Sequence, residues 1–462
     1  MASRLRLRVG PLRSATATTP WLCRAQSRVA APKPEEPQLP PHSLLPNAML
    51  WRSLLVATIS SHPWLLTPAL RLLSLIVHPR GSLFDVNQNP VLRRFLKTTF
   101  YNHFCAGENA VEVTNTIGRI KTMGFKGVIL TYAREIVVDA SSQPASDPAT
   151  TPLESATRET VQAKSPEIEA WREGVLETAE MVGTGDFLAL KLTGAGPLVM
   201  QALSSGQPLP RQMILAINDI CARAVQRGAR IFVDAEQQSI QSGIDRVALD
   251  LMRQYNRNGT TGVYNTYQAY LKSTPQTLLS HMDLSEREGF TVGVKLVRGA
   301  YINSEPRHLI NDTKSATDDS YNAIAAGILR RQYGPFGTQR RFPPADLFLA
   351  THNRQSALAA NRLYQERMAA AQPTTKVQYG QLLGMADEVS CRLLQLRENN
   401  SIESRTTSPE VYKCLSWGTL GDCLSYLLRR AVENRDAVGR TRQEYIALRA
   451  EAGRRIRNLF KV

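Results

Sequence analysis

Cysteine is scarce in this 462-residue sequence, and no apolar run is long. The six cysteines form no CxxC pair and no His/Cys cluster with metal-ligand spacing. We therefore expect scattered thiols in a reducing compartment, with neither a disulfide framework nor a metal site. Residues 48–80 are the most apolar stretch, but Arg52, Pro63, Pro68 and Arg71 interrupt it before it reaches the ~20 residues that span a bilayer. Two interpretations of this stretch remain open: helices packing on the main domain, or an amphipathic segment lying on a membrane surface.

Glycine motifs that bind phosphate are also missing. No G-x-G-x-x-G follows a predicted strand, and no G-x-x-x-x-G-K-[ST] occurs. Gly183–Gly185 and Gly194–Gly196 approach the first pattern, but they lack the third glycine and the following helix. A Rossmann dinucleotide site is therefore not expected, and a flavin would have to be held by another fold.

Acidic residues are absent from the first 34 positions, which contain seven lysines and arginines among many Ser, Thr and Ala residues. Subtracting these charges from the formal net charge of +16 leaves +9 for the rest of the chain. An Arg-rich, acid-free segment without a long apolar block is typical of a mitochondrial presequence and not of a secretory signal. We expect residues 1–34 to direct the protein to the mitochondrial matrix; a basic N-terminus without targeting meaning is the alternative. The body shows no repeated interleaving of basic and aromatic residues, so no nucleic-acid partner is expected.

Segments of low complexity divide the remaining chain. Residues 31–46 are rich in proline and indicate a linker, and residues 140–152 have too little apolar content to pack. We therefore predict a presequence at 1–34 and a proline-rich linker with an apolar helical extension at 35–94. One large domain follows at 95–462, with a disordered insertion near 140–165.

Eight short apolar segments alternate with helical patterns in that domain. Near-continuous runs of Val, Ile, Leu, Phe and Tyr are typical of strands buried on both faces of a parallel sheet. Eight strand–helix alternations over roughly 340 residues favour a (βα)8 barrel of the TIM type over an open sheet. The predicted strands are Gly127–Thr131, Phe187–Thr193, Arg230–Asp234, Val263–Tyr267, Val292–Val297, Asp346–Ala350, Val377–Leu382 and Val411–Leu415. The predicted helices include Ile168–Met181, Pro210–Arg227, Ser239–Tyr255 and Ser356–Ala371.

Polar side chains follow five of these strands where each strand ends. In a barrel the carboxyl ends of the strands carry the functional site. A lone Asp or Lys there is usually a turn residue or a solvated charge, but five polar strand ends in one register predict a site. They are Lys191 with Thr193, Asp234 with Glu236, Gln268, Lys295 with Arg298, and Thr351 with His352 and Asn353.

The helix after the last strand carries a second polar cluster. Tyr426, Arg429, Arg430 and Glu433 are spaced at three and four residues, so they share one helical face. Paired guanidinium groups suit a ligand carboxylate, because Arg offers a planar fork for two hydrogen bonds. A solvated basic face with an Arg–Glu pair is the structural alternative.

Several motifs occur in an order that resembles a known family. Gly293-Val-Lys-Leu-Val-Arg-Gly-Ala-Tyr301, with Glu305 four residues further on, resembles the K/R-L-V-K/R-G-A-Y-x-x-x-E signature of FAD-dependent proline dehydrogenases (proline oxidases). Further matches are Phe104–Glu108, Asp234–Glu236, Gln268–Tyr270, Ala350–Asn353, Leu382–Met385 and Tyr426–Asn434. The resemblance covers roughly residues 95–435. The N-terminal extension, the insertion and the R-R-A-x-E-N-R helix are similar to the fungal mitochondrial branch.

The resemblance implies a distorted (βα)8 barrel that holds FAD at its mouth and binds L-proline on one face of the flavin. It implies hydride transfer from L-proline to FAD, giving Δ1-pyrroline-5-carboxylate as the first step of proline catabolism. Electrons would pass to ubiquinone, and the protein would associate peripherally with the inner membrane.

The resemblance also assigns residues to these roles. The substrate carboxylate would be held by Lys191, Arg429 and Arg430, and Asp234 would organise the site near Lys191. The ring pocket would be lined by Tyr301, Ala300, Leu382 and Tyr426. The FAD contacts would be Gln268, Lys295, Val297, Arg298, Gly299, Lys314, Thr317, Thr351, His352, Asn353 and Glu433. An ionic gate would form between Glu135 and Arg429.

Two residues depart from the family pattern. Lys295 stands where many bacterial members have Arg, and Cys414 stands where many members carry a Tyr that closes the ring pocket. A smaller side chain leaves room for a ring substituent, so a hydroxyproline dehydrogenase is the alternative enzyme. A non-catalytic basic scaffold that binds nucleic acid is a second alternative, against which the concentration of positive charge in residues 1–34 argues. His352 has the chemistry of a general base, but we favour a hydrogen bond to the cofactor.

Overall fold

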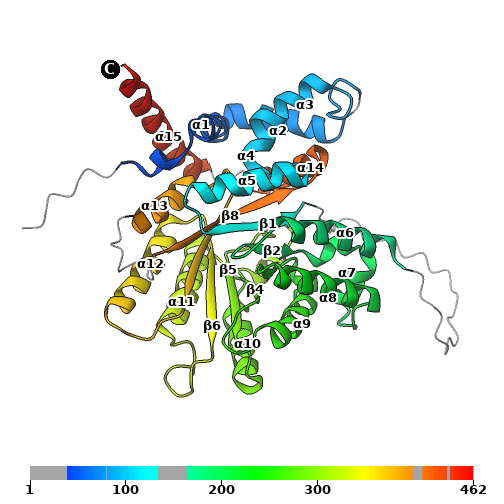
Figure 1. Ribbon diagram of the computed structural model, residues 1–462, viewed down its shortest axis with the longest axis vertical. Coiled ribbons are helices and arrows are strands. Elements are labelled where there is room, and N and C mark those ends of the chain that lie inside the picture. Colours follow the sequence, from blue (N-terminus) through cyan, green and yellow to red (C-terminus); the bar gives the residue numbers. More distant parts are fainter. Residues whose placement is uncertain (1–38, 80, 134–163, 399–407, 434–437, 461–462) are drawn as a thin grey trace, which may run out of the picture. The chain divides into compact units, whose positions relative to one another are not determined.

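Eight parallel strands close into a barrel in the computed structural model, which describes residues 39–79, 81–133, 164–398, 408–433 and 438–460 (Figure 1). Each strand pairs with the next along the chain, and β8 returns to pair with β1, so the predicted (βα)8 fold is confirmed. The strands are β1 (Gly127–Tyr132), β2 (Phe187–Leu190), β3 (Arg230–Val233), β4 (Val263–Gln268), β5 (Val292–Val297), β6 (Ala345–Ala350), β7 (Val377–Leu382) and β8 (Glu410–Trp417). The expected presequence, most of the expected insertion, and Glu135 lie outside the described residues.

Aromatic side chains fill the barrel interior. Phe187 and Phe232 stack with ring centroids 4.1 Å apart, and Phe348 and Tyr412 each meet Phe187 edge-on at 5.2 Å. The guanidinium of Arg230 lies 3.9 Å from the centroid of the Phe187 ring and donates to the Tyr412 hydroxyl at 3.0 Å. A packed interior leaves the loops at the carboxyl ends of the strands to bind ligands.

Helices surround the barrel: they lie before the first strand, between consecutive strands and after the last strand. They are α5 (Ala110–Thr122), α6 (Pro166–Met181), α7 (Pro197–Ser204), α8 (Arg211–Gln226), α9 (Gln238–Tyr255), α10 (Thr274–Glu288), α11 (Lys314–Arg330), α12 (Arg354–Ala369), α13 (Asp387–Glu398), α14 (Leu420–Glu433) and α15 (Val438–Leu459), with the short turns η3 (Leu192–Ala195) and η4 (Arg307–Leu309). The four helices named from the sequence are all present, and their ends differ from the prediction by at most two residues.

The second strand is shorter than the sequence suggested. Its prediction through Thr193 is wrong, because β2 ends at Leu190 and the 3-10 turn η3 begins at Leu192. The indole nitrogen of Trp171 donates to the carbonyl of Lys191 at 3.0 Å, and the Thr193 amide donates to Glu236 at 3.1 Å. These bonds replace the ladder bonds that a longer strand would make, so Lys191 stands at the point where the chain leaves the sheet.

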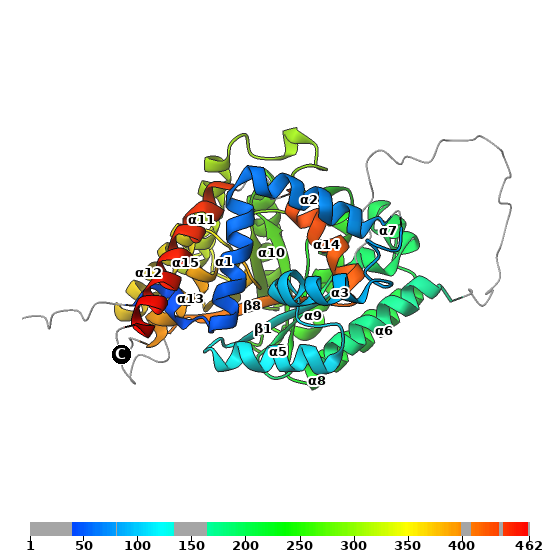
Figure 2. The same cartoon turned by 90° about the horizontal axis from the view of Figure 1, so that it is seen from above.

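An N-terminal helical extension packs against the last helices of the chain (Figure 2). It comprises η1 (Pro41–Leu44), α1 (Asn47–Ser61), α2 (Pro63–Val77), α3 (Pro90–Leu96), the π-helical turn η2 (Lys97–Tyr101) and α4 (Asn102–Phe104). Helix α1 contacts α15, and α2 contacts α14. Leu73 and Ile76 of α2 share one buried apolar cluster with Leu424 and Leu427 of α14. Within the described ranges, no helix has the length and apolar content needed to cross a membrane.

One ion pair is buried between β8 and the start of α13. The ammonium of Lys413 lies 2.7 Å from the Asp387 carboxylate, with side-chain exposures of 1% and 2%. Lys413 also donates to the carbonyl of Met385 at 3.1 Å, so it fixes the turn that follows β7. Burial alone would raise the pKa of Asp387, but the charge and hydrogen bond of Lys413 hold that pKa below its usual range.

Replacing Lys413 is expected to destabilise the fold strongly. Lys413→Met leaves the Asp387 carboxylate buried beside no ammonium, which should lower the free energy of unfolding by about 3–5 kcal/mol. The matched control is Lys126→Met, because Lys126 lies 3.9 Å from Glu410 at the surface, and its loss should cost about 0–1 kcal/mol. Urea unfolding of the three proteins measures both changes.

The pH dependence of this difference has a defined sign. A carboxyl whose pKa is lowered on folding stabilises the protein above its unfolded pKa, and that contribution is lost as pH falls through the folded pKa. The gap between wild type and Lys413→Met should therefore shrink on acidification, as protonation of Asp387 removes the uncompensated charge. Equal losses from Lys413→Met and Lys126→Met at neutral pH would show that the buried pair does not stabilise the fold.

Candidate functional site

The ends of β3 and β5 bring an acid and a cation together at the barrel mouth. The Lys295 ammonium lies 2.5 Å from the Asp234 carboxylate, and the side chains are 11% and 16% exposed. The Lys295 ammonium also lies 4.8 Å from the centroid of the Phe232 ring, which belongs to the aromatic cluster in the barrel interior. The amide of Asp234 donates to the carbonyl of Leu190 at 2.9 Å, so Asp234 also lies beside the chain segment that carries Lys191. The pair compensates a cation that would otherwise be costly to bury.

Arg298, which follows β5 directly, is held by two neighbouring helices. Its guanidinium lies 2.7 Å from Asp318 and donates to the hydroxyl of Thr351 at 2.7 Å and of Ser356 at 2.8 Å. It also stacks 4.3 Å from the centroid of the Tyr321 ring. These four contacts fix the planar group in one orientation.

Asp318 pairs with a second cation besides Arg298, namely Lys314 on its own helix, α11. Lys314 lies 2.5 Å from the same carboxylate, one helical turn away, although its own side chain is 74% exposed. Burial would raise the pKa of Asp318, but the hydrogen bonds from Lys314 and Arg298 lower it. Asp318 and Ser356 were missed by the sequence analysis; the spacing of four between Lys314 and Asp318 was the available signal.

A buried carboxylate braces the loop after β2. Glu236 is 2% exposed and accepts hydrogen bonds from both the amide and the hydroxyl of Thr193. The side-chain amide of Gln268 donates to the Glu236 carbonyl at 3.1 Å. The ends of β2, β3 and β4 are therefore cross-linked beneath Lys191, and the polar strand ends predicted there do lie together.

The run Thr351–Asn353 after β6 is also fully engaged. The amide of Leu382 donates to Nε2 of His352 at 3.2 Å, which places the ring proton of a neutral His352 on Nδ1. Asn353 caps α12 by accepting from the amide of Ser356 at 3.1 Å. Because Nε2 already accepts a hydrogen bond, this geometry favours a donor role for His352 over general-base chemistry at that atom.

Helix α14 approaches the mouth from the side of β2. The ammonium of Lys191 lies 5.4 Å from the centroid of the Tyr426 ring. The side chains of Arg429, Arg430 and Glu433, which the sequence placed on the same helical face, are outside the described part of the structure. Tyr301 is almost fully buried, Cys414 is partly exposed within β8, and Leu382, the last residue of β7, pairs with Cys414 in the ladder.

The side chains at the barrel mouth are mainly hydrogen-bond donors and cations, and these determine which ligands the site can bind. Lys191, Lys295 and Arg298 supply positive charge, and Gln268, Thr351 and His352 supply neutral donors. A carboxylate ligand and a planar cofactor rich in acceptors both match such a donor set. Val297 and Gly299 bring backbone close to the same region, while Lys314 and Thr317 lie on the first turn of α11.

Comparison with known proteins gives this site its context. The family model described as Proline dehydrogenase matches residues 113–443, more than half of the chain. The "Probable proline dehydrogenase, mitochondrial" of Schizosaccharomyces pombe is 29% identical over 459 residues, covering 88% of each chain. "Hydroxyproline dehydrogenase" of Bos taurus is 27% identical, covering 88% of this chain and 90% of the bovine protein.

Solved structures agree with the fold. Proline utilization A from Bdellovibrio bacteriovorus superimposes with a TM-score of 0.59 at 15% sequence identity. The match covers 84% of this chain and 38% of that longer chain. At this identity the likeness establishes the barrel architecture alone.

Proposed function

We propose that this chain, which belongs to the proline dehydrogenase family, oxidises L-proline to Δ1-pyrroline-5-carboxylate with FAD as the hydride acceptor. Family membership makes it an oxidoreductase acting on proline, at the first step of proline catabolism. The observation that carries the finer proposal is the set of polar groups at the strand ends, where Lys295 is held by Asp234, Arg298 is held by Asp318 and Thr351, and Gln268 of β4 is bonded to Glu236.

The described residues of the mouth fit FAD chemically. Its isoalloxazine edge and pyrophosphate present acceptors and negative charge, and the mouth presents oriented donors and cations. The residues that would hold it are Gln268, Lys295, Val297, Arg298, Gly299, Lys314, Thr317, Thr351, His352, Asn353 and Glu433. When bound, FAD supplies the acceptor for the hydride from the ring carbon beside nitrogen. The chain itself needs to fix only distance, face and charge.

Substrate orientation would come from cations at one end and apolar side chains at the other. Lys191, Arg429 and Arg430 would hold the carboxylate, which turns the ring of L-proline away from the charged end. Tyr301, Ala300, Leu382 and Tyr426 would surround the ring, with Asp234 and Glu135 completing the site. The approach of Lys191 to the Tyr426 ring supports a shared pocket for both groups.

In the absence of oxygen, L-proline should bleach the visible flavin bands of the purified protein, and a water-soluble ubiquinone should restore them.

Arg430→Met removes a guanidinium group that would bind the substrate carboxylate. The L-proline concentration that gives the half-maximal bleaching rate should therefore rise about tenfold or more. Arg449→Met, on the exposed side of α15, is the matched control and should behave as wild type. A protein that binds no flavin, or flavin that L-proline does not bleach, would refute the proposal.

A second candidate substrate is 4-hydroxy-L-proline. Cys414 is partly exposed within β8, beside Leu382 at the end of β7, and it offers less bulk than an aromatic side chain. The hydroxyproline dehydrogenases among the relatives match this chain over nearly the same span as the fission-yeast protein. The first observation supports space for a ring hydroxyl, and the second supports hydroxyproline as a candidate substrate.

Cys414→Tyr should therefore change substrate preference. The larger side chain is expected to lower the bleaching rate with 4-hydroxy-L-proline relative to L-proline by about tenfold. Cys414→Ser keeps the small volume and should leave this ratio unchanged. An equal ratio in all three proteins would mean that position 414 does not border the substrate ring.

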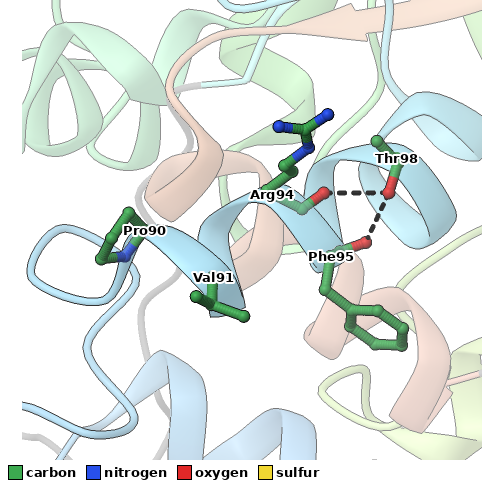
Figure 3. A pocket seen from close by; sticks show the side chains of 5 residues that line it. All are labelled: Pro90, Val91, Arg94, Phe95 and Thr98. Carbon is green, nitrogen blue, oxygen red and sulfur yellow. Dashed lines mark hydrogen bonds between the residues drawn. The ribbon is translucent and has the colours of Figure 1, made fainter.

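The outer face of the N-terminal extension supports peripheral membrane association and delivery of electrons to ubiquinone. Exposed apolar side chains cover α1–α3, including Trp64 at 71%, Val91 at 77% and Phe95 at 61% exposure. Val91, Arg94 and Phe95 are among the residues that line a depression of about 470 Å³ on α3. Figure 3 shows Val91 and Phe95 pointing to one side of the helix and Arg94 to the other. No acidic residue occurs between Glu36 and Asp85, so this face suits an anionic bilayer surface. The composition of residues 1–34 and the mitochondrial relatives support a matrix location.

Vesicle binding tests this surface. Trp64→Glu should weaken co-sedimentation with phosphatidylcholine–phosphatidylglycerol vesicles by roughly tenfold, because a charged side chain replaces an apolar one that would be buried in the bilayer. Ile214→Glu, at an exposed apolar position on α8 outside the extension, should bind as wild type. Wild-type protein that stays in the supernatant, or equal loss in both variants, would contradict the assignment.

A further inference from the structure

The loop between β5 and α11, residues 298–313, carries Tyr301 and is anchored on one side by backbone bonds. The amide of Tyr270 donates to the carbonyl of Arg298 at 2.8 Å, and the amide of Asn311 donates to the carbonyl of Tyr270 at 2.8 Å. Leu271 and Ile310 add an antiparallel bridge. These bonds tie both ends of the loop to the neighbouring connection after β4.

Gly299 makes the first turn of this loop possible. Its φ is +133°, and a Cβ there would lie 2.2 Å from the Cδ1 atom of the Tyr270 ring. Only glycine allows the chain to pass so close to that ring. The turn sets the direction of the chain at Gly299 and leaves the middle of the loop to be fixed by other contacts.

The contact that fixes the middle of the loop comes from Glu305. Its carboxylate accepts a hydrogen bond of 2.6 Å from the amide of Gln238, 67 residues earlier in the chain. Gln238 is the first residue of α9, and no side chain of the preceding residue, Gln237, caps that helix. Glu305 thus satisfies a helix amide that would otherwise lack an intrahelical acceptor. Glu305 as a whole is 9% exposed.

This bond joins two loops that carry residues of the site. The connection from β3 to α9 holds Asp234 and Glu236, and the connection from β5 to α11 holds Tyr301. Glu305 follows Tyr301 by one turn of chain, and its amide donates to the Tyr301 carbonyl at 3.0 Å. A displacement of Glu305 would therefore move Tyr301 relative to Asp234.

We propose that Glu305 is a positioning residue, which locks the loop carrying Tyr301 onto the start of α9 and so sets the width of the substrate pocket. This rests on the proposed function, in which Tyr301 lines the ring pocket. Glu305 touches neither substrate nor cofactor in this role; its acceptor oxygen acts through the Gln238 amide. Burial raises the pKa of Glu305, and a carbonyl oxygen serves the same purpose as a carboxylate.

The acceptor role separates two variants. Glu305→Gln keeps a side-chain oxygen that can accept from Gln238, whereas Glu305→Ala removes it. Asn89→Ala is the matched control, since Asn89 accepts from helix amides at the start of α3 at 3.0 Å and 3.1 Å, in the N-terminal extension. All variants are made in the full chain with bound flavin, and flavin content and melting temperature are recorded for each.

The expected result is a split between these variants. Glu305→Ala should raise the L-proline concentration for half-maximal bleaching by about tenfold, because a small misplacement of a pocket wall has a large effect on rate and binding. Glu305→Gln should restore wild-type values. Asn89→Ala should match Glu305→Ala in lost thermal stability but not in proline dependence. Trypsin should also cut after the exposed Arg307 faster in Glu305→Ala than in Glu305→Gln.

Three outcomes would overturn the inference. Wild-type behaviour of Glu305→Ala would show that the bond positions nothing, and equal impairment of Glu305→Gln would indicate a need for the charge or proton. Equal impairment of Asn89→Ala would indicate general destabilisation. If L-proline fails to bleach the wild-type flavin, the proposed function fails instead, and trypsin cleavage at Arg307 still decides whether Glu305 locks the loop.

Discussion

Closure of the sheet between β1 and β8 is the constraint on which the rest of this structure depends. Six residue pairs, from Gly127 with Tyr412 to Tyr132 with Trp417, join the first strand to the last. Because every strand is parallel, closure gathers all eight carboxyl ends into one ring. Residues separated by more than 200 positions, such as Lys191 and Tyr426, then lie within a few ångströms.

Charge compensation gives that ring its rigidity. Lys295 pairs with Asp234, Arg298 pairs with Asp318, and Lys413 pairs with Asp387, each across a boundary between elements. Burying a cation near a strand end without such a carboxylate would cost free energy. Paired with one, the cation keeps a fixed position and orients the side chains around it. Contacts within the chain therefore hold these side chains in place before any ligand binds. Precise positioning of a ligand requires such an arrangement.

The sequence was sufficient for the architecture and for the gathering of polar residues at the strand ends, because both follow from local patterns. Apolar runs of the right length fixed the strands, and polar residues after them fixed the mouth. The pairing of side chains was not accessible in this way. The pairing of Asp234 with Lys295 was not expected, and Asp318 and Ser356 were not singled out, since contacts between helices and strand ends depend on tertiary geometry. The end of β2 was misplaced for the same reason: Trp171 and Glu236, both distant in sequence, turn the chain after Leu190.

Helix α14 links the mouth to the outer layer of the molecule. One side brings Tyr426 to Lys191, and another buries Leu424 and Leu427 in a cluster with Leu73 and Ile76 of α2. Since apolar burial is what holds α14 in place, the position of its polar face depends on α2. Helix α2 in turn exposes Trp64 on its outer side. The extension thus supports the helix that brings Tyr426 to Lys191, and a surface that binds α2 would act on that helix.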